Sequence, residues 1–556
     1  MRSSFHGQVR TVGPDVASTV IQGGKIKYSK ILSKKEAKAK KGQAKPNVFP
    51  FGYMFDELKA ADGSIRPEHR LPDGGSTPAQ LVALSATMSE DNPRLDRKTN
   101  IGAAYTYLGQ FIDHDITKTE TLDPAVSSAM EAAFQAARAG ASFSPLDQDR
   151  LASLVNKRMP ALNLDSVLSN AAPRDEQGAM RVGSVTTNGV PARPQLPFTE
   201  PAELFNLHDL PRLPPTSTNE ELDRRAQIGD PRNDENLVVA QLHVAFLRAH
   251  RRLVHDKGMS AAQADTALQQ FYQAVVIQDF LPVVCDPAVV AAVLAAPGAF
   301  YRPTPDCPFM PMEFSVAAYR FGHSMVRERY NYNSEFSGQG GKPLATLADL
   351  FTFTAFSGQN FDLPTVPHNW IIDWTRWLKR ADDTLDNDAR PIDTLLAPGL
   401  MNLPQHQGVI AGTDVNILAL RNLVRGYLLS VPTGQAVAQA VRNRLPQIEP
   451  LTAAQLRAVA KDASDAQFDA LVAGGFDVRT PLWYYMLAEA AHVRATSGKA
   501  HLGPIASVII TEVLAQLVRL ADDNFMSVPG WSSAIPLERA DRAQLVDLFR
   551  FAQLFP

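Results

Sequence analysis

Residues 107–115 are Tyr-Leu-Gly-Gln-Phe-Ile-Asp-His-Asp, and they lie in a longer segment, 101–117, whose apolar residues recur every three or four positions. That period predicts an amphipathic helix. On such a helix Gln110, Asp113 and His114 stand at positions i, i+3 and i+4 and therefore share one face. An amide, a carboxylate and an imidazole on one face predict either a chemical site or a polar stripe that faces solvent.

A second polar cluster, Gly-Asp-Pro-Arg-Asn-Asp-Glu-Asn at 229–236, precedes a helix that we expect over 235–256. Asp230 or Asn233 would cap this helix, and acidic residues favour its first turn. Capping does not explain Arg232, because a positive charge is unfavourable near a helix amino terminus. Arg232 therefore predicts a partner such as an anion or a carboxylate.

Two further helical segments carry isolated polar residues. The sequence Ala-Tyr-Arg-Phe-Gly-His-Ser-Met-Val at 318–326 places His323 on an otherwise apolar helix. A buried core histidine explains such a pattern more often than a metal ligand does. The sequence Leu-Arg-Asn-Leu-Val-Arg-Gly at 420–426 places Asn422 and Arg425 on one face. A surface hydrogen bond and a solvated arginine would also account for that pair.

The same helical period recurs along most of the chain, while alternating strand patterns are nearly absent. We therefore predict a mainly α fold, with one large helical domain over 48–556 and long irregular, proline-rich loops. The helices are expected at 101–117, 235–256, 266–281, 314–329, 413–429, 433–444, 452–462, 481–495 and 503–522.

Composition and charge exclude several classes of protein. An apolar fraction of 45% and a net charge of −3 suit a globular protein and give no field for nucleic acid. Two cysteines, Cys285 and Cys307, are too few for a disulfide framework, so free thiols are expected, with one bridge between them as the alternative. No apolar stretch reaches the roughly 20 residues of a membrane span. No secretory signal is visible, which favours a soluble protein that is cytoplasmic or exported by a leaderless route.

The first residues, 1–47, predict a basic and flexible arm. Nine lysines between Lys25 and Lys45 face one acidic residue, Glu36. A solvated segment explains such a run, and so does contact with an anionic surface.

In their order and spacing the four motifs resemble those of the animal-type haem peroxidases of the peroxidase–cyclooxygenase superfamily, particularly bacterial members. The resemblance covers about 48–525, and the segments 241–254, 481–487 and 502–509 are also similar to the family. It implies a haem b cofactor, with His323 as the proximal iron ligand and Asn422 hydrogen-bonded to its other ring nitrogen. The catalytic residues implied are His114, Arg232 and Gln110, and the residues near the haem propionates are Arg320 and Arg425.

The resemblance also implies covalent links and a calcium ion. Asp113, and less surely Glu235, correspond to the carboxylates that form esters with haem, whereas Asn236 replaces the methionine of a third link. Asp115 corresponds to a calcium ligand. The other calcium ligands would come from 159–167, namely the Ala161 carbonyl and the side chains of Asn163 and Asp165. This loop departs from the family pattern at Met159, where threonine is usual, and at Leu168-Ser169, which replaces an aromatic–glycine pair.

The activity implied is reduction of hydrogen peroxide through an oxoferryl intermediate, with oxidation of small phenols or of bromide, iodide or thiocyanate, as in a response to oxidative stress. One alternative is a fatty-acid dioxygenase of the same superfamily, whose radical-forming tyrosine lies three residues before the proximal histidine. Arg320 occupies that position here, and Tyr319 is expected to point elsewhere. A second alternative is a non-catalytic helical binding module. The intact set of polar motif residues argues against it.

Overall fold

The computed structural model describes residues 48–90, 99–186, 207–216, 218–219, 222–355, 363–380, 382–403 and 417–556, together with three two-residue strands near the amino terminus. Apart from those strands, the basic arm expected at 1–47 lies outside the described residues. The domain boundary expected at residue 48 stays a prediction.

Helices form most of the described chain, which confirms the mainly α prediction. The α-helices are α2 (Thr77–Ala86), α3 (Ala104–Ile116), α4 (Pro124–Arg138), α5 (Gln148–Ala152), α6 (Asp165–Leu168), α8 (Leu237–His255), α9 (Ala261–Val275), α10 (Leu281–Val284), α11 (Pro287–Ala295), α12 (Gly322–Met325), α13 (Leu347–Leu350), α14 (Leu418–Leu428), α15 (Gly434–Arg442), α16 (Ala453–Ala463), α17 (Asp465–Ala473), α18 (Leu482–Ser497), α19 (Pro504–Leu520) and α20 (Leu545–Phe551). The 3-10 turns are η2 (Asp56–Leu58), η3 (Pro67–His69), η4 (Pro231–Asp234), η7 (Ala318–Phe321), η9 (His368–Trp370), η10 (Trp374–Arg376), η11 (Pro398–Met401) and η13 (Phe525–Ser527), and the π turns are η5 (Val276–Phe280) and η6 (Glu313–Ala317).

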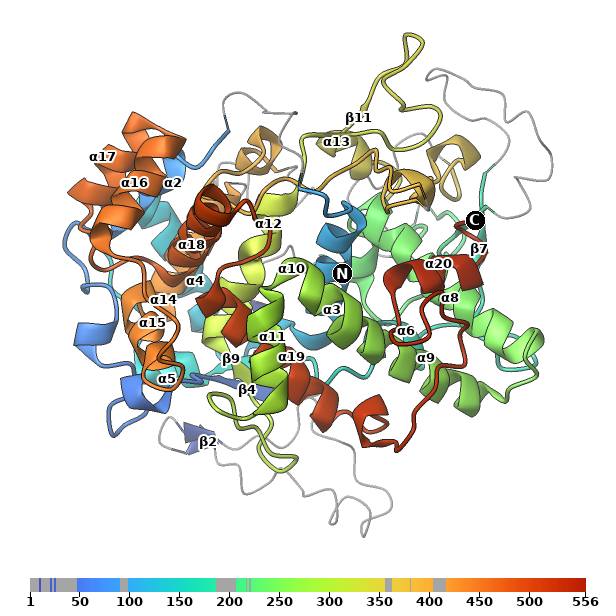
Figure 1. Cartoon of the computed structure of the whole chain (residues 1–556), viewed down its shortest axis with the longest axis horizontal. Helices are drawn as coiled ribbons and strands as arrows, with labels where there is room; N and C mark the ends of the chain where they lie inside the picture. Colours follow the sequence, from blue (N-terminus) through green and yellow to red (C-terminus); the bar gives the residue numbers. More distant parts are fainter. Residues whose placement is uncertain are drawn as a thin grey trace.

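Helix α8 lies at the centre of the core. Every residue from Leu237 to His250 is buried, which is typical of a helix surrounded on all sides. Helix α3 packs along it, and the rings of Phe111 and Phe246 stack with centroids 4.8 Å apart. In Figure 1, α14 to α18 gather on the left and α8, α9 and α20 on the right, with α3, α10, α12 and α19 between them.

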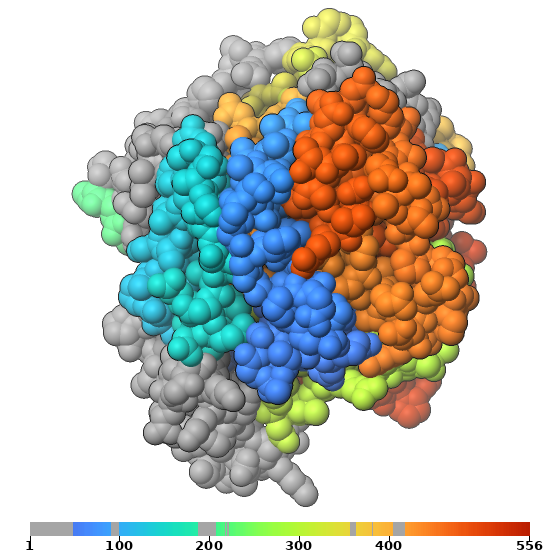
Figure 2. Space-filling model, turned by 90° about the vertical axis from the view of Figure 1, so that its left-hand side faces the viewer, coloured from blue at the N-terminus to red at the C-terminus, as the bar shows by residue number. Residues whose placement is uncertain are grey.

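Helix α2 connects the early part of the chain to the later helices. It contacts α4, α14 and α17. Figure 2 shows the segment that contains it on the surface, between the segment of α4 and α5 and the helices after residue 430.

Two of the expected helices are not regular, and those expectations were wrong in detail. The helix expected at 266–281 passes into the π turn η5, just before Pro282, which has no N–H to donate to the carbonyl four residues earlier. The helix expected at 314–329 is the π turn η6, then the 3-10 turn η7, then the short α12. Such departures from the α-helix re-aim side chains and often occur at functional sites. The start of the helix expected at 413–429 lies outside the described residues.

A small sheet contacts the π turn η6, at the start of the segment that carries His323. Its strand order is β1 (Arg10–Thr11), β5 (Thr119–Thr121), β6 (Leu154–Asn156), β4 (Phe49–Gly52) and β9 (Met310–Pro311). The pairs β1–β5 and β4–β9 are parallel, and β5–β6 and β6–β4 are antiparallel. Three antiparallel strand pairs stand apart: β2 (Ile21–Gln22) with β3 (Lys25–Ile26), β7 (Gly183–Ser184) with β8 (His208–Asp209), and β10 (Arg329–Tyr330) with β11 (Ala345–Thr346). Strands this short give no alternating sequence pattern, so the sequence did not predict them.

Two predictions from composition can be compared with the structure directly. Cys285 and Cys307 are both free. Across the described ranges, none of the helices has both the length and the apolar composition that crossing a bilayer needs.

Candidate functional site

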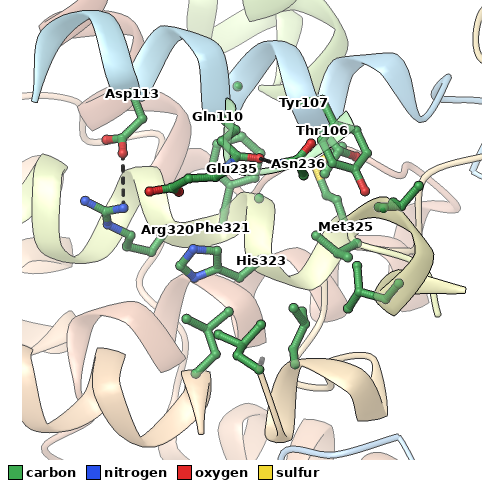
Figure 3. A pocket seen from close by; sticks show the side chains of 18 of the residues that line it. Thr106, Tyr107, Gln110, Asp113, Glu235, Asn236, Arg320, Phe321, His323 and Met325 are labelled. Carbon is green, nitrogen blue, oxygen red and sulfur yellow. Dashed lines mark hydrogen bonds and ion pairs between the residues drawn. The ribbon is translucent and has the colours of Figure 1, made fainter. Parts of the chain in front are cut away.

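A cavity lies between α3 and the segment 313–325 (Figure 3). The space between its walls is about 960 Å³, part of which is open to solvent. Polar side chains of α3 and of the start of α8 form one wall, and His323 lies on the opposite wall. The rest of the lining is mainly apolar and includes Val326, Leu347, Leu350, Phe351, Leu403 and Leu418.

Gln110 and Asp113 point into the cavity from α3, and Glu235 and Asn236 reach it from the start of α8. The Asn236 Nδ2 donates to Gln110 Oε1 over 3.1 Å, and its Oδ1 accepts from the backbone N–H of Val239. Asn236 is therefore the cap of α8, a role that we expected for Asp230 or Asn233. Asp230 instead caps the preceding turn η4.

His323 and Asn422 are in contact on the opposite wall, with 2.9 Å between Asn422 Nδ2 and His323 Nδ1. In this orientation the amide donates to Nδ1. A half turn of the amide brings Oδ1 to the same place, where it accepts from a protonated Nδ1 and leaves the Nε2 lone pair for a metal. No other hydrogen bond of this amide is present among the described residues to oppose that turn. Burial, with Arg320 and Arg421 nearby, holds the pKa of His323 well below its ordinary value, so the ring is neutral.

His114 and Arg232 lie together, but neither side chain borders the cavity. The Arg232 Nη2 donates to the backbone carbonyl of His114 over 2.8 Å. Burial and the charge of Arg232 lower the pKa of His114 to about 3. The ring is therefore neutral, and its position is one layer behind the cavity wall.

Asp230 is the carboxylate partner that the position of Arg232 predicted. Its two oxygens accept from Nε and Nη2 of Arg232 at 3.0 and 2.7 Å, and Arg158 forms a second ion pair with it. Burial alone would raise the pKa of Asp230, but the two arginines outweigh it and hold the pKa well below the usual value.

Buried arginines gather beside the His323 wall. Arg320 pairs with Asp113, and Arg425 borders a second, smaller cavity next to Arg320. The Arg425 Nε is buried with no hydrogen-bond partner in the described part of the chain. Burial lowers the pKa of Arg425 well below its ordinary value, as do the charges of Arg421 and Arg320. The motif at 420–426 contained Arg421, a charged residue on a largely apolar helix, yet the sequence argument did not use it.

Tyr319 lines the cavity, which corrects the expectation that it would point elsewhere. Its ring stacks on Phe314 with centroids 4.6 Å apart. The expectation was made for a regular α-helix, whereas Tyr319 lies in the 3-10 turn η7.

The loop expected to hold calcium does meet Asp115. The two Asp115 oxygens accept from the backbone N–H groups of Leu164 and Ser166, each over 3.0 Å. Burial and the neighbouring Asp165 raise the pKa of Asp115 to about 7. The Asn163 Oδ1 faces another way and accepts from Gln269 and from the backbone of Asp522 at 3.4 and 3.3 Å. The carbonyl of Ala161 accepts from the Asn163 N–H. In the described ranges no three His, Cys, Asp or Glu side chains form a group able to hold a metal ion.

Sequence comparisons point to haem peroxidases. The animal haem peroxidase family matches residues 174–361, which include Arg232 and His323. A peroxidase-like protein of Margaritifera margaritifera is 25% identical over 405 residues, which cover 64% of this chain and 48% of that protein. Thyroid peroxidase of Canis lupus familiaris is 33% identical over 133 residues, 22% of this chain and 14% of that protein. The chain thus spans about half the length of the first of these relatives and less of the second.

Two solved structures share the fold. Peroxidase A from Dictyostelium discoideum superimposes with a TM-score of 0.56 at 15% identity, over 92% of this chain and 94% of that one. A fatty acid alpha-dioxygenase of Arabidopsis thaliana gives 0.52 at 11% identity, over 92% and 85%. The chain thus has the mainly helical fold of these two structures, and its residues 174–361 are similar to the animal haem peroxidase family.

Proposed function

We propose that the chain is a haem peroxidase that uses hydrogen peroxide to oxidise small phenolic donors or halides such as bromide, iodide and thiocyanate. The observation that carries the proposal is the His323–Asn422 pair, which faces Gln110 and Asp113 across the cavity. A neutral, buried histidine with a hydrogen-bonding partner on its second nitrogen is the arrangement that metal-ligating histidines adopt.

The charges around the cavity suit a haem. Haem b carries two propionates. Arg421 and Arg425 are buried and Arg320 is partly buried, and the three lie close to one another beside His323. Buried positive charges are costly unless anions neutralise them, and arginine binds carboxylates through two parallel hydrogen bonds. Arg425, whose Nε has no partner among the described residues, supports this assignment in particular.

The expected roles of the polar residues follow from their protonation. Bound haem supplies the iron at which peroxide is reduced. By the resemblance, His114, being neutral, would accept the peroxide proton and return it to the departing oxygen. Arg232, kept positive by Asp230, would stabilise negative charge on oxygen. Both roles require these side chains, which lie behind the cavity wall, to reach peroxide in the cavity.

The decisive experiment is a hemin titration of the purified full-length protein, followed by its Soret absorbance. We expect one haem per chain, loss of the band in His323→Ala, and a normal band in the matched control His492→Ala, whose ring contacts Gln455 away from the cavity. Peroxide should then drive phenol oxidation and bromination of monochlorodimedone. Absence of haem binding would refute the enzyme and favour a binding module with the same fold.

Fatty-acid oxygenation is a second candidate, supported by Tyr319 in the cavity wall and by the apolar lining. In this case linoleate or arachidonate should cause oxygen uptake, and Tyr319→Phe should abolish that uptake while sparing peroxide-dependent phenol oxidation. Uptake that persists in Tyr319→Phe would remove the tyrosine from the reaction.

Three finer features belong to the proposal. Ester bonds from Asp113, and less surely Glu235, would retain the haem. Calcium would bind at Asp115 with Asp165 and the neighbouring loop, since carboxylates and carbonyls suit a hard cation. Contact of the basic arm with an anionic surface would add a binding role. The test compares the retention on heparin of the full-length protein with that of a variant that lacks residues 1–45.

A further inference from the structure

Asn233 lies between two buried histidines. Its Oδ1 is 2.8 Å from His114 Nδ1, and its Nδ2 is 3.0 Å from His243 Nδ1. All three side chains have no solvent exposure. The amide is therefore held on both sides, behind the cavity wall.

The chemistry of an amide decides which ring nitrogens carry protons. The oxygen of an asparagine only accepts hydrogen bonds, and its NH₂ group only donates them. With the amide oxygen toward His114, as it lies here, His114 carries a proton on Nδ1, which leaves the lone pair on Nε2. In the same orientation His243 accepts at Nδ1 and carries its proton on Nε2, whereas a half turn of the amide would exchange the two tautomers. Both rings are fully buried, and the guanidinium of Arg232 lies next to His114, so a charged imidazolium is unfavourable at either histidine.

We propose that Asn233, oriented by His243, is a positioning residue that fixes His114 in the tautomer with its proton on Nδ1 and its basic lone pair on Nε2. This inference rests on the proposed function for its purpose, because only a basic Nε2 can accept a proton from peroxide. A ring in the other tautomer presents an N–H there and cannot act as the base.

The surrounding structure keeps this arrangement rigid. Asn233 and Arg232 belong to the same short turn, η4, and hold His114 at two points, the ring and the backbone carbonyl. The His243 ring packs edge-on against Phe111, with centroids 6.1 Å apart and an interplanar angle of 68°. Phe111 lies on α3 three residues before His114. The helix that carries His114 therefore also carries the ring against which His243 packs.

The test measures tautomers directly in the full-length protein. Nitrogen-15 NMR of ring-labelled histidine distinguishes protonated from unprotonated nitrogens, and His114→Gln assigns the His114 signals. We expect Nδ1–H at His114 and Nε2–H at His243 in the wild type. Asn233→Ala should give a mixture of tautomers at His114, and so should His243→Phe, which keeps an aromatic ring against Phe111.

Two variants serve as controls. Asn233→Asp keeps an acceptor facing His114 and should preserve the Nδ1–H tautomer. Asn333→Ala removes a buried asparagine whose described partners are backbone groups of Glu335, Phe336, Asn369 and Ile371, and it should leave the His114 signals unchanged. The inference is overturned by an Nε2–H tautomer at His114 in the wild type, or by an unchanged His114 in Asn233→Ala. If Asn233→Ala does not fold, His243→Phe decides in the same way.

Haem-loaded protein gives the second measurement. The rate of reaction with peroxide, followed by stopped-flow absorbance, should fall roughly 10- to 100-fold in Asn233→Ala and recover in Asn233→Asp, as is usual when a residue that orients a site histidine is removed and restored. Failure to bind haem refutes the proposed function, whereas the NMR result still decides this inference. Normal haem binding and a normal peroxide rate in Asn233→Ala refute the inference alone.

Discussion

Arg320 and Asp113 are joined across the edge of the cavity by an ion pair, with 3.2 Å between Nη1 and Oδ2. Arg320 belongs to the segment that carries His323, and Asp113 belongs to α3 on the opposite wall (Figure 3). Thr117 donates to the other Asp113 oxygen over 2.7 Å. The carboxylate at the cavity edge is thus held by hydrogen bonds and must exchange one of them before it can form a bond to haem.

Asp113 is therefore the first residue to change in a test of covalent attachment. After hemin reconstitution and peroxide treatment, we expect wild-type haem to resist denaturing acid extraction and haem from Asp113→Asn to be fully extractable. Glu235→Gln, on the other side of the same wall, should reduce retention less. Equal retention in the wild type and in Asp113→Asn would place the link on another residue.

Loss of the Asn422 amide should weaken haem binding. Removing a group that orients a ligating histidine typically costs about 10- to 100-fold in affinity, so Asn422→Ala should raise the Kd for hemin by that factor. The exposed Asn443, at the end of α15, provides a matched control. A hemin titration that gives the same Kd for both variants would show that Asn422 does not orient His323.

Asp230→Asn should destabilise the fold more than a surface change. It leaves Arg158 and Arg232 without their buried carboxylate, and breaking a buried ion pair by removing one partner costs about 3–5 kcal/mol. Urea unfolding should show this loss, while Asp149→Asn, at an exposed position in α5, should have little effect. Equal unfolding midpoints would mean that the arginines find other partners.

Calcium should stabilise the protein through Asp115. A ligand present at 100 times its Kd stabilises the folded state by about 2.7 kcal/mol. Calcium added after chelation should therefore raise the Tm, magnesium should do so less because it needs a stricter octahedral site, and Asp115→Asn should not respond. A wild-type Tm that is indifferent to calcium contradicts the proposal.

Glu489 should make stability fall as pH rises. Its buried carboxyl faces the amino terminus of α19, and burial, partly offset by the N–H groups of Ile505 and Ala506, raises its pKa to about 8. The folded state then holds a proton that the unfolded state releases at about pH 4.3, so stability declines between about pH 4.3 and 8. The total is on the order of 5 kcal/mol.

The Tm profile from pH 5 to 8 measures this effect. Glu489→Gln copies the neutral carboxyl and should flatten the profile, whereas the exposed control Glu176→Gln should leave the slope unchanged. A slope that survives in Glu489→Gln would assign the pH dependence to other groups.

Long helices with a regular period could be predicted from the sequence. Helices α3, α8, α15, α16, α18 and α19 lie within a few residues of their expected ranges, because the 3.6-residue period fixes which apolar residues face the core. The period also placed Gln110 and Asp113 on one face, and the charge of Arg232 near a helix start predicted a carboxylate partner. The residues that carry the resemblance to the superfamily were likewise visible without a structure.

Only the tertiary structure decided how these elements meet. Asp113 and Arg320 are separated by more than 200 positions, as are His323 and Gln110 on the opposite wall, and no local period relates residues so far apart. Departures from the α-helix at η6 and η7 brought Tyr319 into the cavity wall, against the expectation for a regular helix. Packing likewise set His114 and Arg232 behind that wall and placed Asn233 between two histidines. Helical spacing within one segment is a property of the backbone and can be read from sequence, whereas contacts between segments depend on how their side chains fill the same space.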